Sequence, residues 1–319
     1  MDPRLDGDQG LRGQPVTSPT ETSPAGTPPK GSPPQETPPE PLSRTGARLR
    51  LAALLTPPLL WLGLAYLGSL AVLLLSAFWT TDSFTSDVVH LWNIDNFRTI
   101  LTDPVYRTIT LRTLGVAVAV TLIDALLALP MAFFMARVAS GRWRRALLVA
   151  VLTPLWAGYL VKAYAWRVML GEHGLVNAVL APFGLAGPGY GLTAVVLVLA
   201  YLWLPYMILP VFAALERLPT HHLEASADLG AGAWRTLRLV VLPAVRPALF
   251  AGSVFTFSLS LGDYLTVQIV GGRTQLLGNV IASQVTLDLP LAAALSAVPV
   301  VLIVCYLAAV RRAGALDSL

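Results

Sequence analysis

The stretch that decides the fold of this chain occupies positions 224–243 and reads EASADLGAGAWRTLRLVVLP. It is charged and helix-prone, and it connects two long apolar segments at about 192–214 and 240–261. A shorter polar link would join two membrane spans at a lower cost. The stretch is therefore predicted to be a surface that is offered to a partner in the aqueous phase.

The first half of this stretch, with the residues just before it, predicts a short helix. Pro219 and Thr220 suit a helix start, because proline is tolerated in the first turn and threonine can cap, with His221 as an alternative capping residue. Either start places Glu224 in the first turn, where the helix dipole favours its negative charge. Asp228 follows one turn later on the same face.

The second half predicts another short helix, which meets the first at Gly230. Glycine permits a break or a positive φ at that position. A helix restarting after it would place Trp234, Leu237 and Val241 on one apolar stripe. The alternative is an ordinary amphipathic link on the membrane surface, which the charges and the closing Leu-Pro disfavour. Small residues would let the backbone of a partner come close: Ala225, Ser226 and Ala227.

The composition of the whole chain indicates a membrane protein. Of its 319 residues 55% are hydrophobic and 13% are charged, and the mean hydropathy is +0.65. A soluble domain of this length would need more surface charge. Its one cysteine, Cys305, lies in an apolar run, and its four histidines have no partners at metal-ligand spacing. With no phosphate-binding glycine loop and no hydrolase-like grouping, the chain is predicted to be a non-enzyme that binds no cofactor or metal.

Six apolar stretches predict an all-α membrane protein with about six transmembrane helices, each able to cross a hydrocarbon layer of about 30 Å. They cover about 51–79, 109–136, 146–170, 192–214, 240–261 and 289–310. The chain then divides into four parts. These are a Pro/Ser/Thr-rich tail over 1–47 that is predicted to be disordered, a first span with an extracytoplasmic link over 48–105, a core transmembrane domain over 106–312 that contains the loop 219–243, and a C-terminal tail over 313–319.

The basic residues predict the orientation. They gather before the first span, after the second, around the loop after the fourth, and after the sixth: Arg44, Arg48, Arg50, Arg137, Arg142, Arg144, Arg145, Arg217, Arg235, Arg238, Arg246, Arg311 and Arg312. By the positive-inside rule both termini and the loop 219–243 are cytoplasmic. Arg98 and Arg273 are the clearest exceptions to this alternation.

The loop resembles the cytoplasmic "EAA" loop of ABC-transporter permease subunits. Ser226 departs from the family pattern, in which alanine is usual, but it remains small. The resemblance implies an ABC importer permease fold, with coupling helices that dock on an ATP-binding subunit and transmit its movement. The residues that match the pattern are Glu224, Ala225, Gly230, Leu242 and Pro243; with Ser226, Asp228 and Trp234 they form the predicted docking surface.

Two further regions resemble spermidine/putrescine permease subunits, and the likeness covers about 106–310. They read PLW at 154–156, LVKAYAW at 160–166 and GEHGLVN at 171–177, and then SLGDYLT at 260–266 followed by Gly271-Gly272. The departures are Lys162 in place of the usual arginine, Val267 in place of a common proline, and Arg112-Thr113 in place of an Asn-Ser or Asn-Thr pair. These bear on the substrate rather than on the permease class.

Four residues are candidates for a substrate path. An Asp at mid-membrane costs about 2.5–3.5 kcal/mol, so Asp124 and Asp263 should face protein or a wet cavity. Asp263 is read either as a contact for a cationic substrate or as a structural hydrogen-bonding group, and structural pairing is favoured for Asp124. Trp166 and Tyr264 are path candidates through cation–π contacts, although the aromatic residues of this region are mostly read as an interfacial belt.

The family resemblance also implies an assembly. Its members work in pairs with two ATP-binding subunits, so ATP belongs to the partners, and an extracytoplasmic solute-binding protein delivers the substrate. A heterodimer with a related permease is the family expectation, and a homodimer is left open. The chain would lie as a multi-pass protein among the lipids of a bacterial cytoplasmic membrane, with no nucleic-acid partner. The alternatives are another solute (an organophosphonate, a ferric ion complex or another organic cation), an ion-coupled secondary transporter, or a membrane-embedded enzyme.

Overall fold

The computed structural model describes residues 44–82 and 87–312, with side chains from residue 53 onward. The predicted tail over 313–319 and most of the predicted tail over 1–47 lie outside the described residues, although 44–47 already belong to a helix. The chain separates into two units, 1–58 and 59–319. The described part of the first unit, 44–58, is helical, and the arrangement below concerns the second.

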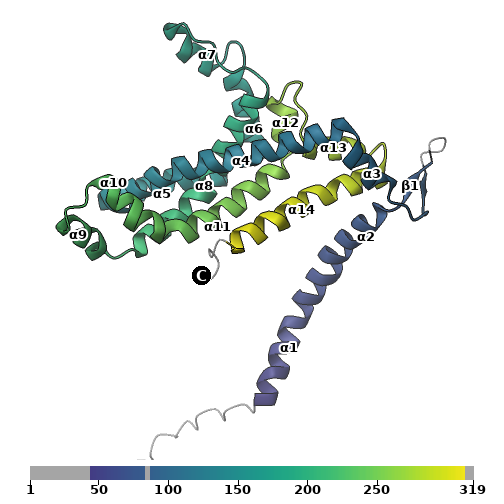
Figure 1. Cartoon of the computed structure of the whole chain (residues 1–319), viewed down its shortest axis with the longest axis horizontal. Coiled ribbons are helices and arrows are strands. Elements are labelled where there is room, and N and C mark those ends of the chain that lie inside the picture. The colour runs from purple at the N-terminus through teal and green to yellow at the C-terminus, as the bar shows by residue number, and fades with distance from the viewer. Residues whose placement is uncertain (1–43, 83–86, 313–319) are drawn as a thin grey trace, which may run out of the picture. The chain divides into compact units, whose positions relative to one another are not determined.

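The described chain is helical apart from one small hairpin (Figure 1). Its first elements are α1 (Arg44–Trp61), the π-helix η1 (Leu62–Leu67), α2 (Gly68–Ser76), strands β1 (Thr80–Thr81) and β2 (Val88–Val89), α3 (Asp95–Thr102), α4 (Pro104–Phe133) and the π-helix η2 (Phe134–Val138). Next come α5 (Gly141–Trp156), α6 (Tyr159–Leu170), α7 (Leu175–Leu180), the 3-10 helix η3 (Ala181–Phe183) and α8 (Leu192–Arg217). The last are α9 (Thr220–Asp228), α10 (Ala233–Thr236), the π-helix η4 (Leu237–Val241), α11 (Leu242–Leu261), α12 (Leu265–Val270), α13 (Leu277–Gln284) and α14 (Leu289–Arg312).

Five helical segments of the described chain are long and apolar enough to cross a membrane, or six if the bent pair α5–α6 counts as one span. The five are Ala53–Ser76, Pro104–Val138, Leu192–Arg217, Ala233–Gly262 and Leu289–Arg312. They confirm the predicted all-α membrane fold.

The third predicted span, 146–170, consists of two helices and not of one continuous helix. Helices α5 and α6 meet at 98° across a break at Ala157 and Gly158, where the backbone turns to extended ψ values of 134° and 140°. Pro154 lies just before the break and lacks the N–H that would bond back along the helix. The apolar composition of this stretch shows its membrane character but hides the bend.

Helices α4, α8 and α11 pack side by side as the centre of the second unit (Figure 1). Val116 of α4 and Val195 of α8 share one hydrophobic cluster, and later residues of both segments, Met135 of η2 and Leu215 of α8, share another. Helices α4 and α8 therefore run in the same direction. Helix α11 runs the opposite way, because Val245 near its start packs in the second cluster. The successive helices α8 and α11 thus run in opposite directions, as successive membrane-spanning helices must.

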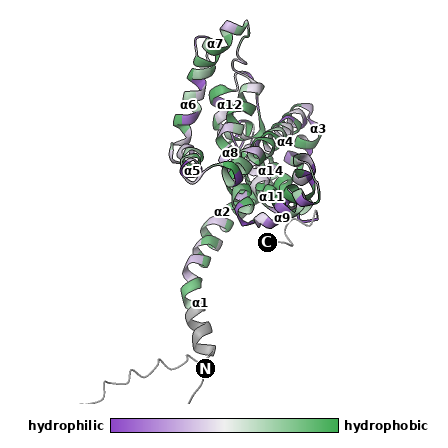
Figure 2. Ribbon diagram, turned by 90° about the vertical axis from the view of Figure 1, so that its left-hand side faces the viewer, coloured by the Kyte–Doolittle hydropathy of each residue, from purple (hydrophilic) through white to green (hydrophobic). Residues whose placement is uncertain are grey.

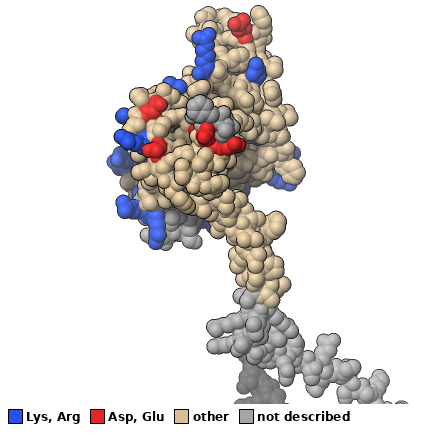
Figure 3. Space-filling model, turned by 90° about the vertical axis from the view of Figure 1, so that its right-hand side faces the viewer, with Lys and Arg blue, Asp and Glu red and all other residues tan. Residues whose placement is uncertain are grey.

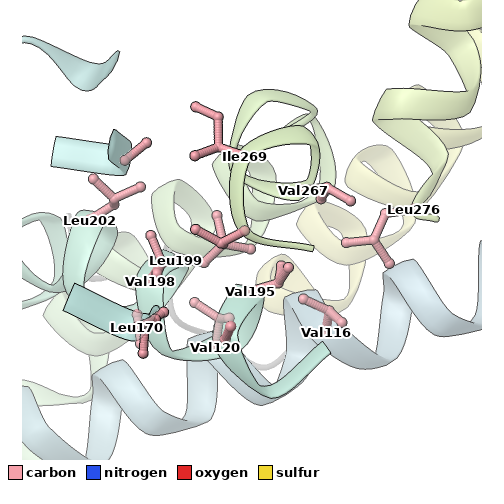
Figure 4. Close-up of a cluster of buried hydrophobic side chains, with 14 residues drawn as sticks. Val116, Val120, Leu170, Val195, Val198, Leu199, Leu202, Val267, Ile269 and Leu276 are labelled. Carbon is pink, nitrogen blue, oxygen red and sulfur yellow. The ribbon is translucent and has the colours of Figure 1, made fainter. Parts of the chain in front are cut away.

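The first cluster joins α4, α6, α8 and α12 at one end of the bundle (Figure 4). Its fully buried members include Val120, Val195 and Leu199. At mid-length α8 and α11 approach unusually closely at Gly252, because a Cβ added there would lie 2.7 Å from Met207 Sδ and 3.0 Å from Met207 Cα. The glycine lets the two helix backbones touch.

Apolar residues make up much of the helices (Figure 2), and many of their side chains are exposed. Leu111, Leu122 and Leu126 on α4 are 65%, 64% and 75% exposed. In a soluble protein such a surface would be a liability, but hydrocarbon or a second membrane subunit can cover it. The exposed apolar surface thus agrees with the membrane assignment.

Candidate functional site

Helix α9 forms the first half of the predicted docking surface. It begins at Thr220 with Pro219 as its N-cap residue, and no side chain caps it, so neither Thr220 nor His221 has the predicted capping role. Glu224 is the fifth residue of the helix and lies outside the first turn, which corrects the prediction that the helix dipole favours its charge. Its side chain is exposed, as a residue that meets a partner must be.

Helix α9 ends in a Schellman motif centred on Gly230, which confirms the predicted break between two short helices. Gly230 has φ +75°, the left-handed conformation that glycine adopts without steric cost. Its N–H donates to the Ala227 carbonyl at 2.8 Å, and the N–H of Ala231 donates to the Ser226 carbonyl at 3.0 Å. These bonds satisfy the last carbonyls of the helix and fix the direction in which the chain leaves it.

The second loop helix differs from the predicted stripe. Val241 is 1% exposed and Leu237 packs beside it in the second cluster, but Trp234 is 72% exposed. Helix α10 continues through the π-helix η4 into α11, so its first turn extends beyond the core and carries Trp234 with it. Trp234 therefore belongs to the free surface and not to the packed face. Leu242, 39% exposed, and the exposed Pro243 lie in the first turn of α11.

A hydroxyl pair joins the two loop helices. Ser226 Oγ lies 2.8 Å from Thr236 Oγ1, and Ser226 is 8% exposed. The serine that departs from the family's alanine therefore makes a contact that alanine cannot make. The role of Thr236 was not predicted, because nothing in a single sequence links it to Ser226, ten positions earlier.

Two arginines, Arg137 in η2 and Arg144 in α5, hold the end of α8, immediately before the loop. The Arg137 guanidinium donates to the carbonyls of Leu215 and Leu218, which are acceptors left free where α8 ends. Arg144 forms an ion pair with Glu216 and also lies 5.4 Å from the centre of the Phe212 ring. The loop therefore starts from a last turn that is tied to both α4 and α5.

The exposed surface of the loop combines acidic and apolar groups. Glu224 and Asp228 are exposed on α9, next to Leu229, which is 88% exposed. With the exposed Ala225 and Trp234 these groups form one exposed surface on two helices. Large apolar side chains this far from the core have no packing role within the chain. Leu229 was not among the residues predicted from the sequence, and its exposure follows from its position at the end of α9, just before Gly230.

Asp263 lies just beyond α11, at the wall of a small hollow. Its Oδ1 accepts from the Thr266 N–H at 2.8 Å, and its Oδ2 accepts from the Thr266 hydroxyl at 3.1 Å and from the Tyr159 hydroxyl. The carboxylate is 8% exposed, and within the described chain no Lys, Arg or His forms an ion pair with it. A buried charge that is held only by neutral donors lacks the counter-ion that usually accompanies it.

The hollow beside Asp263 has a volume of about 280 Å³ and is rich in aromatic rings. The Tyr159 and Trp203 rings stack with centroids 6.1 Å apart, and Tyr264, 42% exposed, joins them in the lining. Trp203 Nε1 is buried and has no hydrogen-bond acceptor. The structure thus brings Asp263 and Tyr264 together and adds two rings that sequence reasoning had not assigned to the path.

The other two path candidates lie elsewhere. Trp166 packs against the first cluster and meets Tyr201 edge-on at 5.3 Å, and it does not line the hollow. Asp124 is fully buried in α4, and neither carboxyl oxygen has a hydrogen-bond partner. Among the described residues, the structural pairing predicted for Asp124 is therefore not formed.

These features define a class of protein: an all-helical membrane protein with an exposed two-helix loop at one end of its bundle. Residues 128–315 match the family described as "Binding-protein-dependent transport system inner membrane component", and the chain belongs to this family. It is thus a multi-pass ABC importer permease subunit of the inner membrane. Members of this family are permease components and not enzymes themselves.

Individual relatives agree with this family. The chain is 46% identical over 288 residues to the inner membrane ABC transporter permease protein YdcU of Escherichia coli (strain K12), covering 85% of this chain and 92% of that protein. It is 33% identical to the spermidine/putrescine transport system permease protein PotB of Haemophilus influenzae, covering 60% of this chain and 68% of that protein.

A solved structure supports the fold. A chain of a bacterial alginate ABC transporter, in complex with an alginate pentasaccharide-bound periplasmic protein, matches with a TM-score of 0.64 at 18% identity. The match covers 83% of this chain and 95% of that chain.

Proposed function

We propose that this chain is a permease subunit of an ATP-driven importer for polyamines such as spermidine and putrescine. The observation that supports this substrate class is the position of the Asp263 carboxylate. It lies at an aromatic-lined hollow without a cationic partner among the described residues. A primary ammonium group is the counter-ion that such a site lacks, and ring faces attract alkylammonium cations. The similarity to the PotB relatives supports the same substrate class.

The loop 219–243 is the proposed coupling device of this importer. Its exposed acidic and apolar groups on α9 and α10 would dock on an ATP-binding subunit, and two such subunits would serve a pair of permeases. The arrangement of basic residues supports a cytoplasmic loop and cytoplasmic termini. An extracytoplasmic solute-binding protein would supply the substrate, and a related permease subunit would complete the path.

The alternative to a polyamine importer is an ABC importer permease for another solute. The YdcU relative carries no substrate in its name. An anionic organophosphonate would meet the Asp263 carboxylate without a compensating cation, so the hollow favours an organic cation over such an anion. A ferric ion complex and another organic cation are the other alternative substrates.

Uptake by the reconstituted transporter tests the proposal. The full complex is placed in vesicles, and ATP-dependent uptake of labelled spermidine and putrescine is measured against a phosphonate. We expect polyamine uptake, and we expect Asp263→Asn to reduce it by roughly tenfold or more, through loss of one charged contact. Trp166→Phe, outside the hollow, is the matched control. Polyamine uptake that is unchanged in Asp263→Asn would remove this residue from the path.

Co-purification tests the coupling part separately. Glu224→Ala and Gly230→Pro should lose the ATP-binding subunit, because the first removes an exposed charge and the second breaks the turn that orients both helices. Uptake that persists with no ATP-binding subunit present would contradict the ABC mechanism and favour ion coupling.

A further inference from the structure

At the end of the bundle opposite the loop, two exposed arginines share one surface. Arg112 is on α4, and Arg273 lies in the turn between α12 and α13. Both line a hollow of about 620 Å³ together with Tyr190, Gly272 and Thr274, and both line an adjoining hollow of about 350 Å³. We call this surface the Arg112–Arg273 patch.

Within the part of the chain that the structure describes, neither arginine forms an ion pair with an acid. The one ion pair found among the described residues joins Arg144 to Glu216, and no acid is part of the lining of either hollow of the patch. Arg112 Nη1 reaches only the Gln275 carbonyl, at 3.5 Å, which is a weak contact. Two guanidinium groups therefore line the same hollows, and neither is neutralised by an acid of the described chain.

The position of the patch makes this charge unusual. From Arg112 to Arg137 the helix rises about 38 Å, at about 1.5 Å per residue, so the patch and the loop lie on opposite sides of a hydrocarbon layer of about 30 Å. With the loop in the cytoplasm, the patch faces outward, where the positive-inside rule disfavours arginine. Arg273 was one of the two exceptions in the sequence. Figure 3 shows this end of the molecule, where basic side chains lie mainly toward the margin and acidic ones nearer the middle.

We infer that the Arg112–Arg273 patch binds carboxylates on the surface of the extracytoplasmic solute-binding protein. This inference rests on the proposed function. Free polyamines would be repelled by two adjacent cations, whereas a docked acidic protein surface would be attracted and held in register. Guanidinium groups suit this contact because each can bind a carboxylate through two parallel hydrogen bonds.

The test measures binding of the solute-binding protein encoded beside this chain to the full transporter in lipid nanodiscs. Arg112→Gln and Arg273→Gln should each weaken binding about tenfold at low ionic strength, and the double variant should lose most of the salt dependence. Arg107→Gln is the matched control, because it removes an exposed arginine of the same helix that lines neither hollow. Retained co-purification of the ATP-binding subunits shows that each variant is folded.

The outcomes separate the two proposals. Equal binding by the wild type, the double variant and the control would overturn the role of the patch while leaving the proposed function in place. Binding that is unchanged while the double variant no longer pairs with its partner permease would also overturn it, and would assign the patch to the permease interface. A wild-type complex that does not bind the solute-binding protein at any ionic strength would overturn the proposed function, and this inference with it.

Discussion

Serine substitutions at two glycines of the loop 219–243 isolate the contribution of one backbone angle to the proposed docking of the ATP-binding subunit. Gly230 has φ +75°, and Gly232, two residues later, has φ −67°. A Cβ added at either position would meet nothing within 4 Å, so neither substitution creates a clash. Both also remove the same conformational freedom from the unfolded chain. What differs is the left-handed conformation, which costs a residue with a Cβ about 1–2 kcal/mol.

We therefore expect Gly230→Ser to weaken docking of the ATP-binding subunit by about five- to thirtyfold relative to Gly232→Ser, because docking must restore the turn at that cost. Gly232→Ser should bind as the wild type does, since serine is well suited to the N-cap position of α10. Gly230→Asn should recover much of the loss, because asparagine tolerates the left-handed region.

The assay is the affinity of the purified ATP-binding subunit for the permease complex in nanodiscs, with thermal unfolding recorded for every variant. Equal docking by the two serine variants would refute the reasoning, as would a greater loss in Gly232→Ser. Either result would mean that the turn at Gly230 does not set the geometry of the docked loop.

Three other substitutions test the packing of the bundle. Gly252→Ala should destabilise the fold by about 1–3 kcal/mol through overpacking against Met207, whereas Gly115→Ala, with open space around its Cβ, should not; thermal unfolding compares them. Arg137→Gln should cost about 1–3 kcal/mol by leaving carbonyls at the end of α8 unpaired, and the ratio of ATP hydrolysed to substrate moved should rise. Asp124→Val should raise the unfolding temperature and preserve uptake, because it removes a buried carboxyl without hydrogen bonds; a loss of uptake would reveal a role in another conformation.

The membrane fold and the break in the loop were both predictable from the sequence, for local reasons. Long apolar stretches require helices in a membrane, because backbone polar groups there must be satisfied within the segment. Gly230 between two helix-prone runs predicts a left-handed helix end. The position of Glu224 was missed because Pro219, which has no side-chain oxygen, occupies the N-cap in place of the expected Thr220 or His221.

The hollow beside Asp263 could not be predicted from local signals. Its carboxylate meets the hydroxyl of Tyr159, more than a hundred positions earlier in the chain. The bend between α5 and α6, which precedes Tyr159 directly, depends on how the backbone turns at Gly158. A single sequence specifies residue types and spacings, but contacts of such long separation depend on the packing of whole helices.

The unbroken run from α10 through η4 to the end of α11 has a mechanical consequence. It spans residues 233–261, about 43 Å at 1.5 Å per residue, and Asp263 follows two positions later. A rigid rod of this length that pivots by about 5° at its loop end swings its far tip by about 4 Å. A small movement of a docked ATP-binding subunit would therefore become a larger displacement at the Asp263 carboxylate, without any relay of side chains in between.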